Sequence, residues 1–331
     1  MITLYHESRF GLARGAVFAG GRPHLYMEGL ETDPSLALVG TRSIARLKGR
    51  AGGVAFLDLA CGGEAILDVP PHDLAKLADG MAVEVDIAAE ARRDKLARAR
   101  LLRPAPSEPL QRLSPPMTLK DRLLAEARAC FGDVAVEIET DEDALDDAAE
   151  AAMAPRPDMP GGGRLHVERT RALIACDVDG AGLTEARAKT NERAVAEVAR
   201  RLRLMGLAGL VVVDLIGRRH DDKRLHDILR QAFGAEAAAI ITAPAGKFGT
   251  LEFVRPWRAC PSADRPLALR QAVRLMRDAA REARSQPGRV LALRAPADVL
   301  DIVRPHLAYS YDPLSPLLRL ETGQSCEVIA S

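Results

Sequence analysis

The chain has 331 residues, enough for two or more domains, and 47% of them are hydrophobic, so a substantial buried core is expected. Lysine plus arginine and aspartate plus glutamate each number 46, which excludes a uniformly basic nucleic-acid coat but leaves local basic patches possible. Aromatic residues make up only 4% of the chain, which argues against a surface with many base-stacking side chains.

The first forty residues read as short strands broken by turns. Segment 41–103 contains strand-like runs separated by glycine-rich turns, at 43–48, 54–59, 64–69 and 82–87. Closely spaced strands with glycine at the corners predict a small barrel, and an OB-fold is the commonest barrel of that size. A proline-rich joint at 104–109, followed by Pro115 and Pro116, marks the end of this segment.

The rest of the chain alternates helices and strands. Helices are predicted at 119–129, 141–152, 184–205, 221–233, 265–285 and 297–305. Strands are predicted at 134–139, 166–169, 171–177, 209–216, 237–242, 290–294 and 315–320, with a second joint at 155–163. This rhythm is typical of a layered α/β protein.

Two of these strands run through apolar residues and carry an aspartate at or near the end, Asp177 and Asp214. A carboxylate there is costly unless something compensates it. One long helix joins the two strands, so both side chains can meet at one edge of a sheet. Converging carboxylates repel each other, and a hard divalent cation, most often Mg²⁺, removes the repulsion. Metal-assisted attack on a phosphodiester is the leading interpretation, and an aspartate that caps the next turn or helix is the structural alternative.

The cysteines, the N-terminus and the apolar runs indicate the compartment in which the protein is expected. The five cysteines are far apart and form no C-x-x-C pair, so neither a zinc site nor a disulfide framework is predicted. The N-terminus lacks the layout of a signal peptide, and no apolar run approaches the ~20 residues of a membrane span. We therefore expect a reduced, soluble, cytoplasmic protein with no membrane partner.

A family resemblance sharpens these expectations. The run from Gly162 to Asp179, GGRLHVERTRALIACDVD, closely resembles the catalytic signature of the RNase E/RNase G endoribonuclease family. The resemblance continues through 189–191, 196–204 and 209–216, and ends with 247–252, KFGTLE, which is similar to the family's Arg-Phe-Gly-Leu-Leu-Glu. Upstream, 39–58 resembles the beginning of the family's OB-fold.

The resemblance implies an α/β multidomain fold. An RNase H-like part, 1–40 and 104–160, would be interrupted by an OB-fold RNA-binding barrel at 41–103. A DNase I-like α/β catalytic domain would follow at 161–256, and a small αβ C-terminal domain at 257–331.

By the same resemblance, the family's two metal-binding aspartates fall on Asp177 and Asp214. The family's asparagine two residues after the first aspartate is Asp179 here, which could be a third ligand, a neutral stand-in for the amide, or a sign of lost activity. A further acidic position falls on Gly217.

Two other family features are incomplete. The zinc-linking Cys-Pro-x-Cys survives only as Cys260-Pro261, so a homo-oligomer would not be zinc-linked. The segment that senses a 5′-monophosphate is missing between about 103 and 119, so that preference is not carried over.

Several residues are candidates for RNA contact, with solvated charge as the alternative for each cation. In the barrel, Phe56 could stack on a base, while Ile66 replaces a second aromatic. Lys48 and Lys95, with Arg50, Arg92 and Arg93, would form a cationic face. In the catalytic domain, the RNA-binding candidates are Arg187, Lys189, Asn191, Arg218, Arg219 and Lys247; the arginines and lysines among them could pair with phosphate.

A few neighbouring residues have their own alternatives. Asn191 could orient a carboxylate or be an exposed helical residue. His220 is not expected to be a general base, and Phe248 is expected to pack in the core. The arginine-rich helix at 265–285 could bind RNA, although a solvated face is slightly favoured.

The leading hypothesis is a Mg²⁺-dependent endoribonuclease that cleaves single-stranded RNA in RNA processing or decay, with Asp177 and Asp214 holding the metal and Asp179 tuning it. The first alternative is a non-catalytic RNA-binding protein on the same scaffold. The second is a metal-dependent hydrolase of a small phosphodiester that uses the barrel for assembly.

Overall fold

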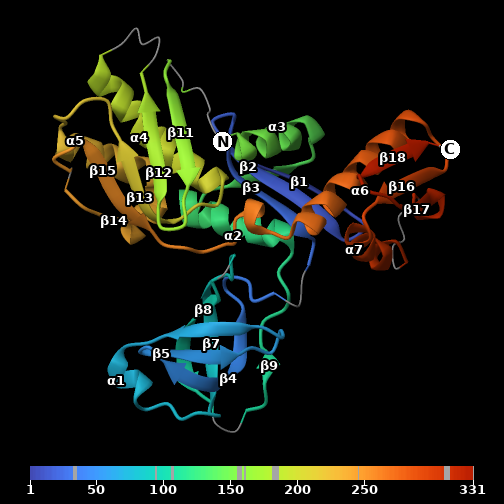
Figure 1. Cartoon of the computed structure of the whole chain (residues 1–331), viewed down its shortest axis with the longest axis horizontal. Coiled ribbons are helices and arrows are strands. Elements are labelled where there is room, and N and C mark those ends of the chain that lie inside the picture. Colours follow the sequence, from blue (N-terminus) through green and yellow to red (C-terminus); the bar gives the residue numbers. More distant parts are fainter. Residues whose placement is uncertain are drawn as a thin grey trace.

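The computed structural model describes residues 1–32, 36–93, 95–105, 108–154, 159, 162–180, 186–244, 246–308 and 314–330. Parts of the two predicted joints and the first residues of the helix predicted at 184–205 lie outside these ranges. The chain has the mixed α/β, multidomain character that the sequence predicts, and its described residues form four separate sheets (Figure 1).

The first sheet combines strands from the beginning of the chain with one strand that follows the barrel segment. Strands β1 (Ile2–Arg9), β2 (Leu12–Ala19) and β3 (Arg22–Leu30) form an antiparallel meander, and β10 (Val136–Glu139) pairs in parallel with β1. Helices α2 (Leu119–Phe131) and α3 (Glu142–Met153) each bury an apolar stripe against this sheet, in two separate cores. The meander strands are longer than the short strands predicted for the first forty residues.

The second sheet is a closed barrel. Strands β4 (Arg42–Ala51), β5 (Val54–Asp58), β6 (Glu64–Asp68), β8 (Ala97–Pro104) and β7 (Ala82–Ala89) pair in that order, and β7 returns to β4. The two-residue β9 (Gln111–Arg112) adds to β4, and the short helix α1 (Pro71–Leu74) follows β6. Four of the barrel strands lie where the sequence predicts them, whereas β8 was not predicted.

The third, central sheet carries the candidate site. Its order is β11 (Arg164–Arg169), β12 (Ile174–Asp179), β13 (Gly209–Asp214), β15 (Thr250–Arg255) and β14 (Ile241–Thr242). Helices α4 (Arg187–Leu204) and α5 (Asp222–Phe233) pack on one face around a core that includes Val198, Val213 and Phe253. The other face is open, with apolar side chains such as Leu210 and Ile241 exposed on it.

Two details of the central sheet differ from the prediction. The strand expected at 237–242 is mostly the 3₁₀ helix η1 (Gly234–Ala239), and only two residues form β14. Strand β15, which was not predicted, lies between β13 and β14 and so decides what borders the candidate site.

The fourth sheet is C-terminal, with the order β17 (Leu318–Thr322), β16 (Leu291–Ala295), β18 (Glu327–Ala330). Helices α6 (Leu267–Ser285) and α7 (Ala297–Ala308) build its core together with Phe10 and Leu12 from the first sheet. The short helices η2 (Ser262–Asp264) and η3 (Ser315–Leu317) precede α6 and β17, so the strand predicted at 315–320 begins three residues late.

Three arginines of the arginine-rich helix α6 form ion pairs with α3, while Arg274 stays exposed. Arg277 and Arg281 pair with Asp146 of α3, and Arg284 pairs with Glu142. The acidic helix and the basic helix therefore partly neutralise each other where the two sheets meet, so the solvated face favoured from the sequence holds only for part of α6.

A buried carboxylate fastens the barrel to the remainder of the molecule. Glu90, just after β7, accepts hydrogen bonds from Arg122 of α2, from Arg265 ahead of α6, and from the backbone N–H of Cys260. All five cysteines are free thiols. None of the helices within the described ranges combines the length and the apolar character that crossing a membrane requires.

Candidate active site

Asp177 and Asp214 lie side by side at the carboxyl end of the parallel pair β12–β13. The register pairs Ile174 with Val211 and, three residues later, Asp177 with Asp214. Adjacent strands are about 4.8 Å apart, and residues paired in register project from the same face of the sheet. Both side chains are exposed on the open face, opposite α4 and α5.

Strand alternation explains how two carboxylates are tolerated on such apolar strands. Cys176, Val178 and Val213 face the helices and are buried, so the intervening aspartates face outward. The two carboxylates therefore avoid the cost of desolvation because they point to solvent, and not because a partner neutralises them. Burial raises the pKa of the Cys176 thiol to about 12, so this cysteine is a neutral packing residue behind the aspartates.

The aspartates form the middle of a row of polar side chains across four strands. His166 of β11 is paired in register with Asp177, and Thr250 of β15 with Asp214. The Thr250 hydroxyl donates to the Glu252 carboxylate, two residues along the same face, at 3.0 Å. Thr250 and His166 were not predicted as site residues, although the alternation of 250–255 could have indicated β15 and hence this neighbour.

Asp179 lies on the same face of β12, two residues beyond Asp177, and is paired in register with Arg164 of β11. The described residues contain no group of three or more histidine, cysteine, aspartate or glutamate side chains close enough to hold a metal ion. A cation here would thus be held by the Asp177–Asp214 pair, with water and phosphate oxygens completing its shell. Mg²⁺ commonly binds proteins in this way, so the donor set fits it.

Neither member of the pair has an ion pair or a hydrogen bond from its side chain within the described ranges. Two like charges in register and without a neutralising arginine repel each other. A divalent cation would relieve that repulsion. An aspartate that only caps a turn or helix would not need a second carboxylate beside it.

Beside the pair, the first turn of α4 and the loop after β13 enclose a pocket of about 360 Å³. Arg187, Arg218 and Arg219 line it and are exposed, and no acidic partner of these three is found in the described part of the chain. The structure therefore brings three of the predicted phosphate-binding residues together. Lys189, on the same turn of α4, is exposed but is not part of the pocket lining.

Asn191 neither orients a carboxylate nor lies exposed on the helix, which were the two alternatives considered from the sequence. It is only 1% exposed; its side-chain oxygen accepts from the Ile216 N–H at 3.0 Å and its amide donates to the Ile216 carbonyl at 3.1 Å. This reciprocal pair fixes the loop that carries Arg218 and Arg219. The His220 ring also contacts Asn191 and the Gly217 carbonyl, so it is held inside this loop.

A second loop borders the same edge. A Cβ on Gly249 would lie 2.3 Å from the Gly217 carbonyl oxygen, so only glycine permits this close approach of the two loops. The approach places Lys247 and Phe248 beside the Arg218 loop. Phe248 is 86% exposed, so the prediction that it packs in the core is wrong.

The barrel candidates lie elsewhere. The hairpin turn between β11 and β12 faces the barrel, whereas the carboxyl ends of β12 and β13 point away from it (Figure 1). Phe56 is half-buried beside Ile66, and Lys48 forms ion pairs with Glu64 and Asp58. Lys95 lines a pocket at the hairpin turn and not at the aspartate pair. The structure does not gather these three with the catalytic candidates.

Comparison with known proteins finds similarity in the central region of the chain. Residues 135–258 match the model of the Ribonuclease E/G family. Ribonuclease E of Nostoc sp. is 34% identical over 116 residues, which is 33% of this chain and 17% of that protein. Ribonuclease E of Escherichia coli is 34% identical over 127 residues, 36% of this chain and 12% of that protein. A chloroplastic Ribonuclease E/G-like protein of Arabidopsis thaliana is 26% identical over 121 residues, 34% and 12% respectively. The matched segment contains the whole central sheet and spans only a small share of these relatives.

Proposed function

We propose that this chain, whose residues 135–258 match the model of the Ribonuclease E/G family, is a Mg²⁺-dependent endoribonuclease that cleaves single-stranded RNA in RNA processing or decay. The observation that carries the proposal is the register of Asp177 with Asp214, both exposed on the open face of the central sheet. The names of the relatives support RNA as the substrate. The proposed surroundings are an RNase H-like part for the first sheet, an OB-fold for the barrel and a DNase I-like central sheet.

The chain's residues divide the work as follows. Asp177 and Asp214 would hold Mg²⁺, which when bound polarises a phosphate oxygen and lowers the pKa of a water molecule. Arg187, Arg218 and Arg219 would bind the backbone phosphates on either side of the scissile bond, because guanidinium forks match phosphate oxygens. Attack of water on phosphorus would then leave a 5′-phosphate on the downstream product.

Two further residues would position the strand. Phe248 is an exposed aromatic ring beside this pocket, and a base that leaves the stack can lie against such a ring. Asn191 would act indirectly, by holding the loop of Arg218 and Arg219 through Ile216. Unpaired RNA offers both its bases and its backbone to a single surface, which is why single strands are the expected substrate.

A non-catalytic RNA-binding protein is the second candidate. Asp179 at the position of the family's asparagine favours it, as does the absence of a third acidic or histidine ligand among the described residues. Both candidate functions use the arginine pocket to bind RNA. They differ in whether the aspartate pair still supports cleavage of the phosphodiester bond.

The discriminating experiment uses the full chain, a labelled single-stranded RNA and Mg²⁺, with EDTA as the metal-free arm. Asp177→Asn and Asp214→Asn should each lower the cleavage rate by on the order of 100-fold or more, because each removes a carboxylate that would hold Mg²⁺ and thus weakens the charge stabilisation that the metal would supply to the transition state. Asp301→Asn on α7, an exposed carboxylate far from the site, is the matched control and should cleave normally.

Binding measured in EDTA completes the test. Neutralising Asp177 or Asp214 removes negative charge near the RNA path, so it should leave affinity equal or slightly higher. Tight binding with no Mg²⁺-dependent cuts by the wild-type protein would reject the nuclease and select the binding protein.

A further inference from the structure

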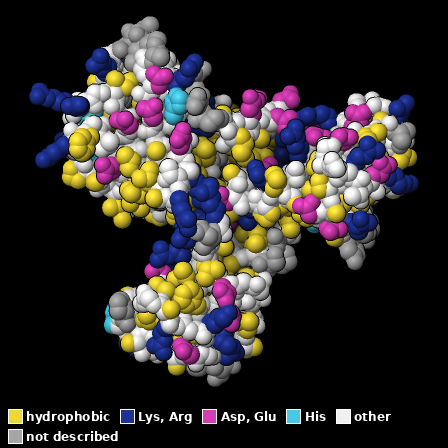
Figure 2. Space-filling model, viewed as in Figure 1, with side chains coloured by type: hydrophobic (Ala, Val, Ile, Leu, Met, Phe, Trp, Pro, Cys, Tyr) yellow, Lys and Arg dark blue, Asp and Glu magenta, His cyan; other side chains and the backbone are white. Residues whose placement is uncertain are grey.

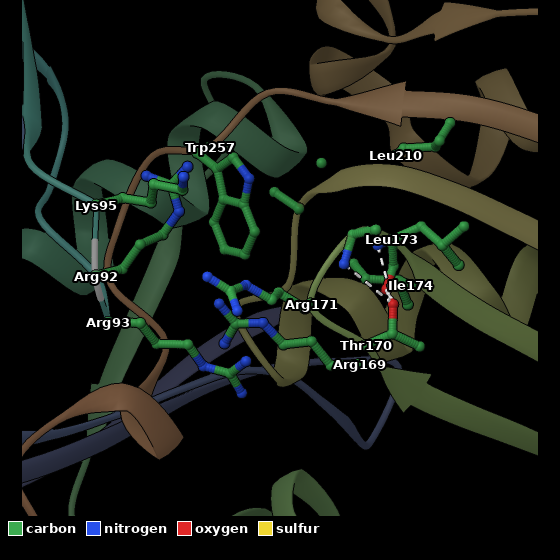
Figure 3. Close-up of a pocket in the computed structure, with 13 residues that line it drawn as sticks. Arg92, Arg93, Lys95, Arg169, Thr170, Arg171, Leu173, Ile174, Leu210 and Trp257 are labelled. Carbon is green, nitrogen blue, oxygen red and sulfur yellow. Dashed lines mark hydrogen bonds between the residues drawn. The ribbon is translucent and has the colours of Figure 1, made fainter.

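A second pocket, of about 570 Å³, lies where the barrel meets the turn of the β11–β12 hairpin (Figure 3). Five basic side chains line it together with the indole of Trp257 and the apolar residues Leu173, Ile174 and Leu210; the basic residues are Arg92, Arg93, Lys95, Arg169 and Arg171. Three of these come from the barrel and two from the hairpin. Figure 2 shows the same place as a group of dark-blue side chains between the barrel and the rest of the molecule.

Only part of this positive charge is neutralised. Asp264, whose side chain is 2% exposed, accepts hydrogen bonds from Arg169 at 2.6 and 2.7 Å and from Arg93 at 3.1 Å. Arg92, Lys95 and Arg171 form no ion pair among the described residues, although the Asp264 charge also acts on Arg92. One carboxylate thus faces five basic groups at this pocket, and three of them form no ion pair with it.

Arg92 shows the strain of this arrangement most clearly. Its guanidinium lies 4.1 Å from the centre of the Trp257 ring, and its Nη1 atom is buried with no hydrogen-bond partner in the described structure. Burial, and next the nearby Arg169 charge, lower the pKa of Arg92. A buried donor without an acceptor is unfavourable, and an anionic oxygen would satisfy it.

The turn itself is rigid and presents Arg171 outward. The Thr170 hydroxyl donates to the Leu173 carbonyl at 2.8 Å and accepts from the Leu173 N–H at 3.0 Å. Gly209 lies against the indole, because a Cβ there would be 3.1 Å from the Trp257 Nε1 atom. Packing therefore fixes both the ring and the turn before any ligand arrives, which lowers the entropic cost of binding.

We propose that this pocket binds the phosphate backbone of single-stranded RNA, with Arg92, Lys95 and Arg171 on phosphates and a base or ribose against Trp257 and Leu210. The inference rests on the proposed function, since its ligand is the same RNA. Phosphate recognition by unpaired arginines beside an aromatic ring and an apolar wall suits a nucleic-acid strand better than an acidic peptide, which offers no flat ring.

The position of the pocket explains how the site could serve cleavage. Ile174 lines the pocket and Asp177 is three residues further along β12, which at about 3.3 Å per residue is roughly 10 Å. A strand anchored in the pocket would therefore cross the open face of the sheet and reach the aspartate pair within a few nucleotides. The pocket would act as a binding site upstream or downstream of the cut.

Tryptophan fluorescence measures ligand binding at this pocket directly, because Trp257 is the single tryptophan of the chain. We would titrate the full chain in EDTA with a single-stranded 12-nucleotide RNA and follow tryptophan fluorescence, with the anisotropy of the labelled RNA in parallel. Saturable quenching at the same concentration in both signals is expected. Asp214→Asn should quench as the wild type does, so the pocket is tested separately from cleavage.

Two substitutions test the contacts. Arg171→Ala and Lys95→Ala should each weaken binding by about 5- to 10-fold and reduce the slope of log affinity against log salt by about 0.7 per lost phosphate contact. Arg171→Lys should restore part of the loss. Arg304→Ala on α7, an exposed arginine outside the pocket, is the matched control and should bind as the wild type does. Unchanged circular dichroism and melting temperature would show that the variants are folded.

Three results would overturn the inference. RNA binding without any change in tryptophan fluorescence, and with wild-type affinity for Arg171→Ala and Lys95→Ala, would place the RNA elsewhere, whether or not the protein cleaves it. Equal quenching by a polyglutamate peptide would show a general anion site. Equal affinity for uridine monophosphate and the 12-nucleotide RNA would show a mononucleotide site and not a strand site.

Discussion

Glu90 offers a sharp test of how the barrel is fastened. Its side chain is 4% exposed and accepts from Arg122 at 2.8 and 3.1 Å, from Arg265 at 2.9 Å and from the Cys260 N–H at 2.9 Å. The Arg122 and Arg265 side chains are only 12% and 10% exposed. Glu90→Ala would leave two buried guanidinium groups without their carboxylate. Removing one partner of a buried ion pair typically costs about 3–5 kcal/mol of folding free energy.

Glu84, on the strand β7 that leads to Glu90, provides a matched control. Its side chain is 3% exposed and also pairs with two arginines, Arg42 and Arg103, but theirs are 57% and 56% exposed. Those arginines regain water when the carboxylate is removed, so Glu84→Ala should lower the free energy of unfolding far less. The comparison separates burial of the partners from the number of ion pairs.

Equilibrium urea unfolding, followed by Trp257 fluorescence and by circular dichroism, measures both variants. Glu90→Gln keeps an acceptor oxygen but loses the charge, so its stability should lie between the wild type and Glu90→Ala. If Glu90→Ala loses no more stability than Glu84→Ala, then Arg122 and Arg265 find other partners or water, and the reasoning from burial is refuted.

Three further predictions concern single side chains. Phe248→Ala should weaken single-stranded RNA binding by about tenfold, as loss of one base stack does, with no change in melting temperature; unaltered affinity by anisotropy would contradict it. Asn191→Leu should cost about 2–3 kcal/mol in urea unfolding, because it leaves the buried N–H and carbonyl of Ile216 unpaired, and a smaller loss would mean that the loop re-pairs. Burial first, and then the Arg203 charge, lower the pKa of His24 to about 3, so the folded state does not take the proton that the unfolded state binds below pH ~6.5. Wild-type stability should therefore fall by up to about 1.4 kcal/mol per pH unit from pH ~6.5 towards 3, and His24→Gln should lose that component; equal pH dependence of unfolding for both proteins would reject the assignment.

The sequence predicts the aspartate pair because the information is local. Apolar runs of strand length, each ending near an aspartate, are visible in 171–177 and 209–216, and a single helix between them favours parallel strands. That topology brings both aspartates to one edge of the sheet, and the structure adds the register that pairs Asp177 with Asp214. The direction of the side chains follows from the sequence, since strand alternation sends them to the face opposite Cys176 and Val213.

The strands that were not predicted have weak local patterns. β8 alternates alanine with arginine in ARAR, so its apolar face is built from the smallest side chains. β15 begins directly after the Phe248-Gly249 turn, and its alternation of Leu251 and Phe253 with polar residues covers few positions. Without β15, the sequence does not indicate that Thr250 borders Asp214, or that Phe248 lies in an exposed turn.

Charge pairing between distant segments is the other part that the sequence does not reveal. The arginines of α6 are spaced as on a solvated face, yet Arg277 and Arg281 meet Asp146, more than a hundred residues earlier. Asp264 likewise takes up Arg93 and Arg169 from two different sheets. Nothing in the spacing of these residues indicates their partners, because the pairing depends on how the sheets pack against each other.

Against these long-range ion pairs, the charges that form no ion pair stand out. The chain has as many acidic as basic residues, and long-range ion pairs join its sheets. At one end of the β11–β12 hairpin, however, Asp177 lies beside Asp214 of β13, and neither forms an ion pair within the part of the chain that the structure describes. At the other end Arg171, Arg92 and Lys95 form no ion pair there either, although Asp264 pairs with their neighbours Arg93 and Arg169. Like charges held together cost folding free energy, so a fold that only needed stability would gain by pairing them. The proposed binding of a metal ion at one end of the hairpin and of RNA phosphates at the other would require both clusters to remain open, and that requirement would account for the two ends together.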